Sequence, residues 1–369
     1  MSVETLRASA SSRWMFCSGS VGLEANFPNI DNTSSLEGTA AHEMAERTLK
    51  GEVSHPAELV NTLAVNNVIM TSEMVEPVLT YVNFINSHNS GYWVEKFLEL
   101  PGTPVKGTND SSIFNFDELN GILRGNDFKY GFGPVEIFEN WQMLIYMICL
   151  VLELQHQGHT VKQIIMSIIQ PRGHHHDGPI RSWTVSVEQL RDYQRQLMKR
   201  VNLIVSGDQT CVSGPHCRYC KALAYCDVAK AASMNAVDVI GDNLPDTETP
   251  QEIANLLRVL KRAEDMVKHT KSAITMRAES MISKGQQIPG FAVVPGTGHR
   301  KFSDEKAAIA TAKCFGIDLT EPKIVTPAEA ERRGLKREII DTMAFSPSTA
   351  PRLIEHDASH EINEAFKNE

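Results

Sequence analysis

The pattern of hydrophobic and polar positions in the first part of the chain predicts helices followed by strands. Helix-forming residues predominate in 36–50 and again in 72–88. Alternating and β-branched residues then predict three consecutive strands, at 92–100, at 105–114 and in a segment that ends near Tyr130. We expect these three strands to pair as an antiparallel sheet.

The next segments continue the alternation of helix and strand. An apolar helix is predicted at 140–156, and the nearly continuous apolar run at 161–170 is typical of a buried strand. A short strand at 180–185 and an amphipathic helix at 187–206 follow. This order predicts an α/β fold in which helices flank a mixed sheet.

The apolar pattern of the third strand is interrupted. Asn120-Gly121 is a strong hairpin signal that leads into Ile122 and Leu123. Arg124-Gly125-Asn126 then breaks the apolar run before Asp127. We therefore expect this strand to be short, bulged or twisted.

The chain of 369 residues is long enough for one large domain and a smaller one. We assign 1–235 to the first domain and 236–250, which is rich in turn-forming residues, to a linker. The region 251–369 is predicted to begin with a helix at 251–284 and to continue as a small α+β region. Its basic residues could guide DNA, but a solvated surface is the simpler interpretation for Arg300, Lys301, Arg332, Arg333, Lys336 and Arg337.

The sequence predicts a cytoplasmic protein that does not enter a membrane. Its first residues lack the basic and then apolar order of a secretion signal. The longest apolar run, 141–154, is well short of the roughly 20 residues that span a membrane. The seven cysteines therefore fit reduced thiols or metal ligands better than a disulfide framework.

The net charge of −9 argues against a generally basic surface that coats nucleic acid. DNA remains a candidate substrate, because nuclease sites gather carboxylates around cations and need only local basic contacts. The candidates for those contacts are Arg7, Arg13, Lys106, Lys129, Arg172 and Arg181.

Asp110, Asp127 and Lys129 are the candidates for phosphodiester chemistry, which needs oxygen ligands for cations and a positive group near the phosphate. Residues two apart on a strand point the same way, so Asp127 and Lys129 share one face. The carbonyl of Phe128 could add a ligand, and Glu95 could approach from the first strand. Taken alone, an Asp-x-Lys pair is more often a surface ion pair.

Cys217, Cys220 and Cys226 form a C-x2-C-x5-C pattern with the spacing of metal ligands. Thiolates suit either zinc or an iron–sulfur cluster. A local zinc site would take its fourth ligand from Cys211 or His216. The two other cysteines are expected to be ordinary buried thiols: Cys149 and Cys314.

Three adjacent histidines, His174 to His176, precede Asp177 in a segment rich in glycine and proline. Successive residues of a regular element cannot all face one ion. We predict an exposed hairpin loop here, with DNA contact as a minor alternative.

The order of short motifs along the chain resembles a known nuclease family. The motifs are Arg13-Trp14-x2-Cys17, Gly38-x3-His42, Gly107-Thr108-Asn109-Asp110, Asp127-Phe128-Lys129 and Gln142-x3-Tyr146. They resemble the iron–sulfur branch of the RecB-like PD-(D/E)xK nucleases, which includes AddB-type and CRISPR-associated exonucleases. The region beyond 288 is similar to the C-terminal half of a phage and prophage family that carries this nuclease.

The resemblance implies a role for each matching residue. His42, Asp110, Asp127 and the carbonyl of Phe128 would bind Mg²⁺ or Mn²⁺, and Lys129 would be catalytic. Two residues on one helical face would lie beside the site and contact DNA or steady the lysine: Gln142 and Tyr146. A distant cysteine would complete the ligands of a structural [4Fe-4S] cluster, namely Cys17 with Cys217, Cys220 and Cys226.

The resemblance also implies a setting, a phage-type exonuclease that degrades DNA from its ends during recombination or DNA processing. Its partners would be DNA and a single-strand annealing or recombination protein, and an oligomer is compatible with the sequence. Two alternatives are a non-catalytic DNA-binding or assembly protein with the same fold and cluster, and a zinc-stabilised interaction module.

Overall fold

The computed structural model describes residues 4–27, 33–88, 90–115, 121–241, 249–283 and 285–291. By its contacts the chain divides into two compact units, Met1–Val293 and Val294–Glu369. The second unit lies outside the described residues. It includes Cys314 and the basic residues that were considered as a surface for guiding DNA. Everything below concerns the first unit.

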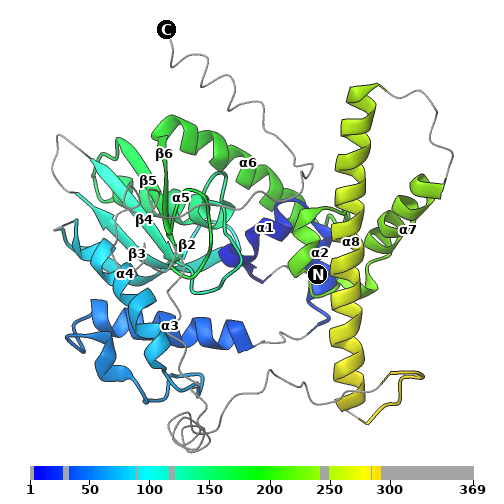
Figure 1. Ribbon diagram of the computed structural model, residues 1–369. Helices are drawn as coiled ribbons and strands as arrows, with labels where there is room; N and C mark the ends of the chain where they lie inside the picture. The colour runs from blue at the N-terminus through cyan, green and yellow to red at the C-terminus, as the bar shows by residue number, and fades with distance from the viewer. Residues whose placement is uncertain are drawn as a thin grey trace, which may run out of the picture. The chain divides into compact units, whose positions relative to one another are not determined.

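The first unit contains a mixed sheet of six strands (Figure 1). Its strands are β1 (Leu6–Arg7), β2 (Tyr92–Glu99), β3 (Val105–Phe114), β4 (Ile122–Phe128), β5 (Gln163–Ile169) and β6 (Ile180–Ser186). The pairs β2–β3, β3–β4 and β5–β6 are antiparallel, whereas β1–β3 and β4–β5 are parallel. The predicted α/β fold with a mixed sheet is confirmed.

Strands β1 and β4 share one edge of β3. Lys106 pairs with β2 on one side and with Arg7 of β1 on the other. Ser111 likewise pairs with β2 on one side and with Asn126 of β4 on the other. Within the described part of the chain, residues 107–110 of β3, between these two pairings, therefore have no strand beside them on this edge, and the gap makes room for a site.

Helices cover both faces of the sheet (Figure 1). The longer ones are α3 (Thr33–Leu49), α4 (Val75–Asn86), α5 (Trp141–His156), α6 (Val187–Val205), α7 (Asp227–Gly241) and α8 (Pro250–Ser283). Short helical turns are η1 (Ala8–Ala10), α1 (Ser11–Trp14), α2 (Gly19–Glu24), η2 (Pro56–Leu59), η3 (Ser72–Met74), η4 (Pro215–Tyr219) and η5 (Leu223–Tyr225). One core contains α5 and α6, and the other contains α3 and α4.

Strand β4 is regular, so the expected bulge or shortening was wrong. It pairs with β5 without interruption from Ile122 to Phe128. Gly125 is required because α5 lies very close to the sheet: a Cβ atom at this position would lie 2.0 Å from Cε of Met147. Asn126 is fully buried and donates a 3.3 Å hydrogen bond to Oγ of Ser111. The polar break in the sequence thus reflects close packing and an internal hydrogen bond.

Two remaining predictions concern the chain after the sheet. The proposed linker, 236–250, begins inside α7, which continues to Gly241, and residues 242–248 lie outside the described part. The domain boundaries drawn from the sequence stay a prediction. Among the described helices, none is both long and apolar enough to cross a membrane.

Candidate active site

The two predicted carboxylates lie where β3 and β4 separate. Ser111 and Asn126 are the last residues paired between these strands, and Asp110 and Asp127 occupy the next positions. Oδ2 of Asp110 accepts a 2.7 Å hydrogen bond from the backbone N–H of Phe128. The carboxylate thus replaces the missing strand partner and holds the two strand ends close together.

Asp127 is the centre of a hydrogen-bonded group of side chains. Lys129 Nζ lies 2.9 Å from Oδ2 of Asp127, whose side chain is only 2% exposed. Gln142 on α5 donates to Oδ1 of Asp127 at 3.1 Å, and its Nε2 also lies 3.3 Å from the hydroxyl of Tyr146. Lys129 donates to Oε1 of Gln142 at 3.4 Å. The face of the strand segment that carries Asp127 and Lys129 therefore contacts the face of α5 that carries Gln142 and Tyr146.

His42 and Glu95 complete the acidic side of the site. Nδ1 of His42 lies 3.6 Å from Oδ2 of Asp110, and its ring packs against Phe128 at 5.3 Å between centroids. Ligand atoms of His42, Glu95 and Asp110 all lie within 4.8 Å of one another, as a divalent cation requires. Glu95 has a left-handed φ of 47° inside β2, a strained conformation for this residue type.

The crowded carboxylates repel each other and are poorly solvated. Burial raises the pKa of Glu95 to about 8, and the nearby charges of Asp110 and Glu46 add to the effect. The pKa of Asp110 is also raised, mainly by burial, with His42 opposing and Asp127 reinforcing the shift. Burial alone would lower the pKa of Lys129, but Asp127 and Asp110 raise it above its usual value. Such a group binds a cation favourably.

These residues open into a pocket of about 490 Å³ at the gap beside β3. Arg7 and Lys106 also line it, so the pocket contains positive charge as well as carboxylates. Tyr146 packs against Gly107, where a Cβ atom would lie 3.0 Å from Cε1 of the ring. Gly107 and Tyr146, which both belong to the sequence motifs, therefore shape the pocket together.

The other basic residues proposed to contact DNA differ in their exposure and partners. Arg181 is 4% exposed and its guanidinium donates to backbone carbonyls and Gln170, so it is not available for DNA. Arg13 forms a 2.9 Å ion pair with Glu24. Arg172 stacks between the rings of Tyr130 and Phe132, 4.1 Å from each centroid.

The structure brings Cys17 beside the segment 210–217, which is almost two hundred residues further along the chain. Its Sγ accepts a 3.4 Å hydrogen bond from the N–H of Val212 and lies 4.0 Å from the carbonyl of Thr210. His216 hydrogen-bonds to both Cys17 and Cys217. These contacts to Cys17 and Cys217 raise the pKa of His216 to about 10.

The other thiols gather nearby. Cys217, Cys220 and Cys226 pack around Leu223, and burial followed by the charge of Glu24 raises the pKa of Cys220 to about 12. Cys211 interacts with Cys17 and Cys226 and was only a secondary candidate in the sequence. A Cβ atom at Gly19 would lie 2.5 Å from Sγ of Cys211, so glycine is needed for this close approach, which no sequence spacing indicates.

The histidine segment forms the loop between the antiparallel strands β5 and β6, and His174, His176 and Asp177 are exposed, so the predicted exposed hairpin loop is confirmed. His175 is an exception. The side chain of His175 is 5% exposed, and its Nε2 lies 3.1 Å from Oε1 of Glu136. His176 stacks on it and remains 80% exposed. Ligand atoms of His175, His176 and Asp177 lie within 4.8 Å of one another, so the loop can gather two histidines toward one point, unlike a regular element.

Comparison with known families places the chain in one of them. Residues 4–360 match the family described as "Protein of unknown function (DUF2800)". The chain belongs to the DUF2800 family. It is also similar to the crystal structure of a "Putative exonuclease" from Eubacterium rectale, at 13% identity and a TM-score of 0.35. That match covers 67% of this chain and 91% of the other, and a likeness this distant carries no inference about activity.

Proposed function

We propose that this DUF2800 member is a metal-dependent exonuclease of the RecB-like PD-(D/E)xK type, which hydrolyses DNA from its ends. The observation that carries the proposal is the convergence of Asp110, Asp127 and Lys129 in one pocket with His42. Together with Gln142 and Tyr146, which line the same pocket, these residues come from two helices and the ends of two strands, so an accidental surface ion pair does not account for their meeting.

The donor set fits a divalent cation with oxygen ligands. His42, Glu95 and Asp110 would hold Mg²⁺ or Mn²⁺ together with Asp127, and the carbonyl of Phe128 remains a candidate ligand. The raised pKa values of Glu95 and Asp110 support this assignment, because a cation would remove the repulsion between them. When bound, such an ion makes a water molecule nucleophilic and neutralises the phosphate.

The protein residues position the reacting groups. Lys129 stays protonated because Asp127 and Asp110 raise its pKa, so it acts as a fixed positive charge for the phosphate or the attacking water. Gln142 forms hydrogen bonds with both Asp127 and Tyr146 and so fixes the position of the Asp127 carboxylate relative to Lys129. Arg7 and Lys106, which line the pocket, would bind the adjacent DNA backbone.

The cysteine segment fits a structural iron–sulfur cluster held by Cys17, Cys217, Cys220 and Cys226. The backbone N–H of Val212 donates a 3.4 Å hydrogen bond to Sγ of Cys17, and that of Gly214 donates one of 3.4 Å to Sγ of Cys217. Hydrogen bonds to the sulfurs are common in iron–sulfur sites. Zinc with Cys211 or His216 is the competing assignment, since both residues lie beside the same thiols.

Incubation of purified protein with end-labelled linear DNA and with covalently closed circular DNA tests the nuclease proposal. We expect release of label from linear DNA with Mg²⁺ or Mn²⁺, no product in EDTA, and intact circles. Absence of hydrolysis in the iron-replete protein would leave the non-catalytic DNA-binding alternative. An annealing or recombination protein would be its natural partner, because such proteins take up the strand that an exonuclease exposes.

A further inference from the structure

A second pocket, of about 580 Å³, lies beside the cysteine segment and is separate from the residues of the candidate active site. One wall is η4 with the adjoining loop, and the other is helix α8. Met266 of α8 packs against the core of Cys217 and Leu223, which holds the helix over the segment. The volume is in the range of pockets that bind small molecules or single nucleotides.

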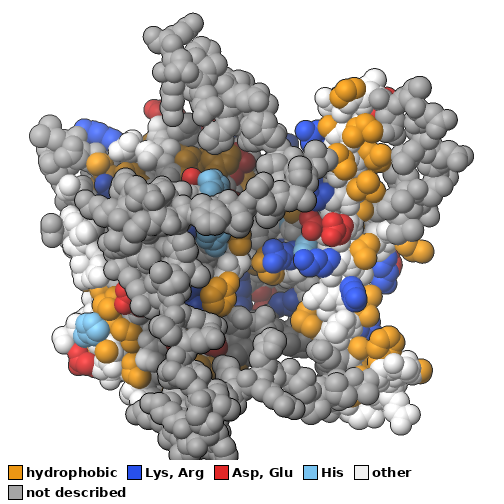
Figure 2. Space-filling view, viewed as in Figure 1, with side chains coloured by type: hydrophobic (Ala, Val, Ile, Leu, Met, Phe, Trp, Pro, Cys, Tyr) orange, Lys and Arg blue, Asp and Glu red, His pale blue; other side chains and the backbone are white. Residues whose placement is uncertain are grey.

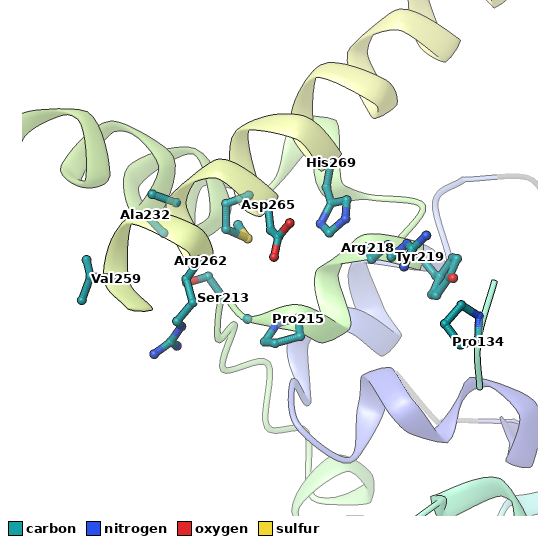
Figure 3. Close-up of a pocket in the computed structure, with 13 residues that line it drawn as sticks. Pro134, Ser213, Pro215, Arg218, Tyr219, Ala232, Val259, Arg262, Asp265 and His269 are labelled. Carbon is teal, nitrogen blue, oxygen red and sulfur yellow. The ribbon is translucent and has the colours of Figure 1, made fainter. Parts of the chain in front are cut away.

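Charge is distributed unevenly along this pocket (Figure 3). Asp265 and His269 project from one face of α8, with Arg262 toward one end and Arg218 toward the other. Asp265 and His269 are four residues apart, and residues with this spacing lie on the same face of a helix. A carboxylate between two guanidinium groups favours a ligand segment whose centre is neutral and whose anionic groups lie on either side of that centre.

The centre of the pocket is suited to a neutral polar group. Nδ1 of His269 is shielded from solvent and has no hydrogen-bond partner within the described part of the chain. Burial, and then the positive charge of Arg218, lowers the pKa of His269, so the ring is uncharged at neutral pH. Asp265 can accept hydrogen bonds there, and His269 can donate or accept one.

Apolar surface for stacking is present at the Arg218 end. The ring of Tyr219 is 63% exposed, and the guanidinium of Arg218 lies 5.2 Å from its centroid. Aromatic rings and guanidinium planes are the groups on which unpaired bases stack. Figure 2 shows hydrophobic side chains among basic and acidic ones along α8. Val259, which lines the pocket, is one of the exposed hydrophobic residues of this helix.

We propose that this pocket binds a short segment of single-stranded DNA. A base lies between Asp265 and His269, its flanking phosphates reach Arg218 and Arg262, and the neighbouring base stacks on Tyr219. The choice of DNA rests on the proposed nuclease function, whereas the pocket itself is independent of the hydrolytic residues. The pocket would hold the strand apart from the point of cleavage.

Fluorescence anisotropy with a labelled dA12 oligonucleotide in EDTA, where no hydrolysis occurs, tests the proposal. We expect the double variant Arg218→Ala/Arg262→Ala to bind about tenfold more weakly or worse. The slope of log affinity against log salt should fall by about 1.4, because each lost phosphate contact on a single strand removes about 0.7. The charge-matched control is Lys268→Ala/Lys271→Ala, two exposed residues of α8 outside the pocket, with less than a twofold effect.

Two further measurements test the base contact. Asp265→Ala should weaken dA12 but leave binding of an abasic oligonucleotide unchanged. Equal losses in both arginine and lysine double variants, or equal competition by poly-glutamate, would overturn the proposal, the latter in favour of an acidic peptide. Binding of dA12 in EDTA is measured without hydrolysis, so failure of the nuclease assay and failure of this site give different results.

Discussion

The candidate active site and the cysteine segment are held in place by two different kinds of backbone. Asp110 and Asp127 lie on paired strands, and their separation is fixed by a register that ends one residue before them. Cys17 and Cys217 lie on short helical turns and loops, and few hydrogen bonds join these turns. A sheet can hold like charges close together, and the proposed metal cluster at the cysteine segment would add bonds where hydrogen bonds are few.

The largest expected effect is on the sheet side of this comparison. Asp110→Ala and Lys129→Ala should each reduce DNA hydrolysis by about 10³-fold or more, because each removes charge at the reacting phosphate. The fold should remain, because β3 and β4 stay paired from Ser111 and Asn126 onward, although Asp110→Ala loses the hydrogen bond from the N–H of Phe128. Initial rates on labelled linear DNA and circular dichroism check this, with exposed Asp192→Ala and Lys199→Ala as matched controls. Activity close to wild type in either active-site variant would refute the assignment.

On the cysteine side we expect loss of structure as well as of metal. The protein as isolated should be brown, with about four irons per chain. Cys17→Ser should lose iron as completely as Cys220→Ser, and its free energy of unfolding should fall by about 4 kcal/mol or more. Iron analysis and thermal unfolding are the measurements.

Two other cysteines sharpen this test. Cys149 is buried within α5, away from the segment, so Cys149→Ala should keep its iron. Cys211→Ser decides between ligand sets, because Cys211 interacts with both Cys17 and Cys226. Iron retained in Cys17→Ser but lost in Cys211→Ser would mean a local ligand set, and zinc without iron would mean a zinc site.

A smaller effect concerns the close packing that supports the strands. Gly125→Ala should cost about 1–3 kcal/mol in urea unfolding, because its Cβ would overlap the buried side chain of Met147. Gly131→Ala is the control, since a Cβ there has open space and the backbone is not left-handed. The cost of Gly125→Ala should shrink in a Met147→Ala background, and an undiminished cost would point to strain elsewhere.

The smallest effect is a pH dependence in metal-free buffer. Glu95 has a pKa of about 8 in the folded protein against an ordinary value of 4.5. As pH rises between these values the unfolded state loses its proton first, so the free energy of unfolding falls. Glu95→Gln should remove this decline, on the order of 1–2 kcal/mol for a partly exposed group. Glu99→Gln, exposed on the same strand, should keep it, and unfolding curves at pH 5 and pH 8 decide.

Much of the fold was readable from periodicity. Strands β2 and β3 and helices α5 and α6 lie within a residue or two of their predicted bounds, because each is a long segment with one dominant period. Strand β4 was misjudged at Gly125, since the need for glycine comes from α5, a distant part of the chain. The residues around Gly125 do not indicate that α5 packs so closely against it.

The candidate site was predictable where spacing fixes direction and unpredictable where the backbone is irregular. The two-residue spacing placed Asp127 with Lys129 and the four-residue spacing placed Gln142 with Tyr146, and both pairs are in contact. That the two pairs meet was implied only by the family resemblance. The left-handed Glu95 and the buried His175 depend on backbone turns and tertiary contacts that no period describes. The C-terminal predictions concern residues outside the described part of the chain.

The contact between Cys17 and Thr210 has a consequence for synthesis on the ribosome. These residues are 193 positions apart, so at roughly 5–20 residues per second the ribosome needs about 10–40 s to make the second after the first. Throughout that interval the early thiol has no partner, although the strands between can already pair. Translation speed therefore sets how long the thiol of Cys17 waits for the segment that contacts it in the folded protein.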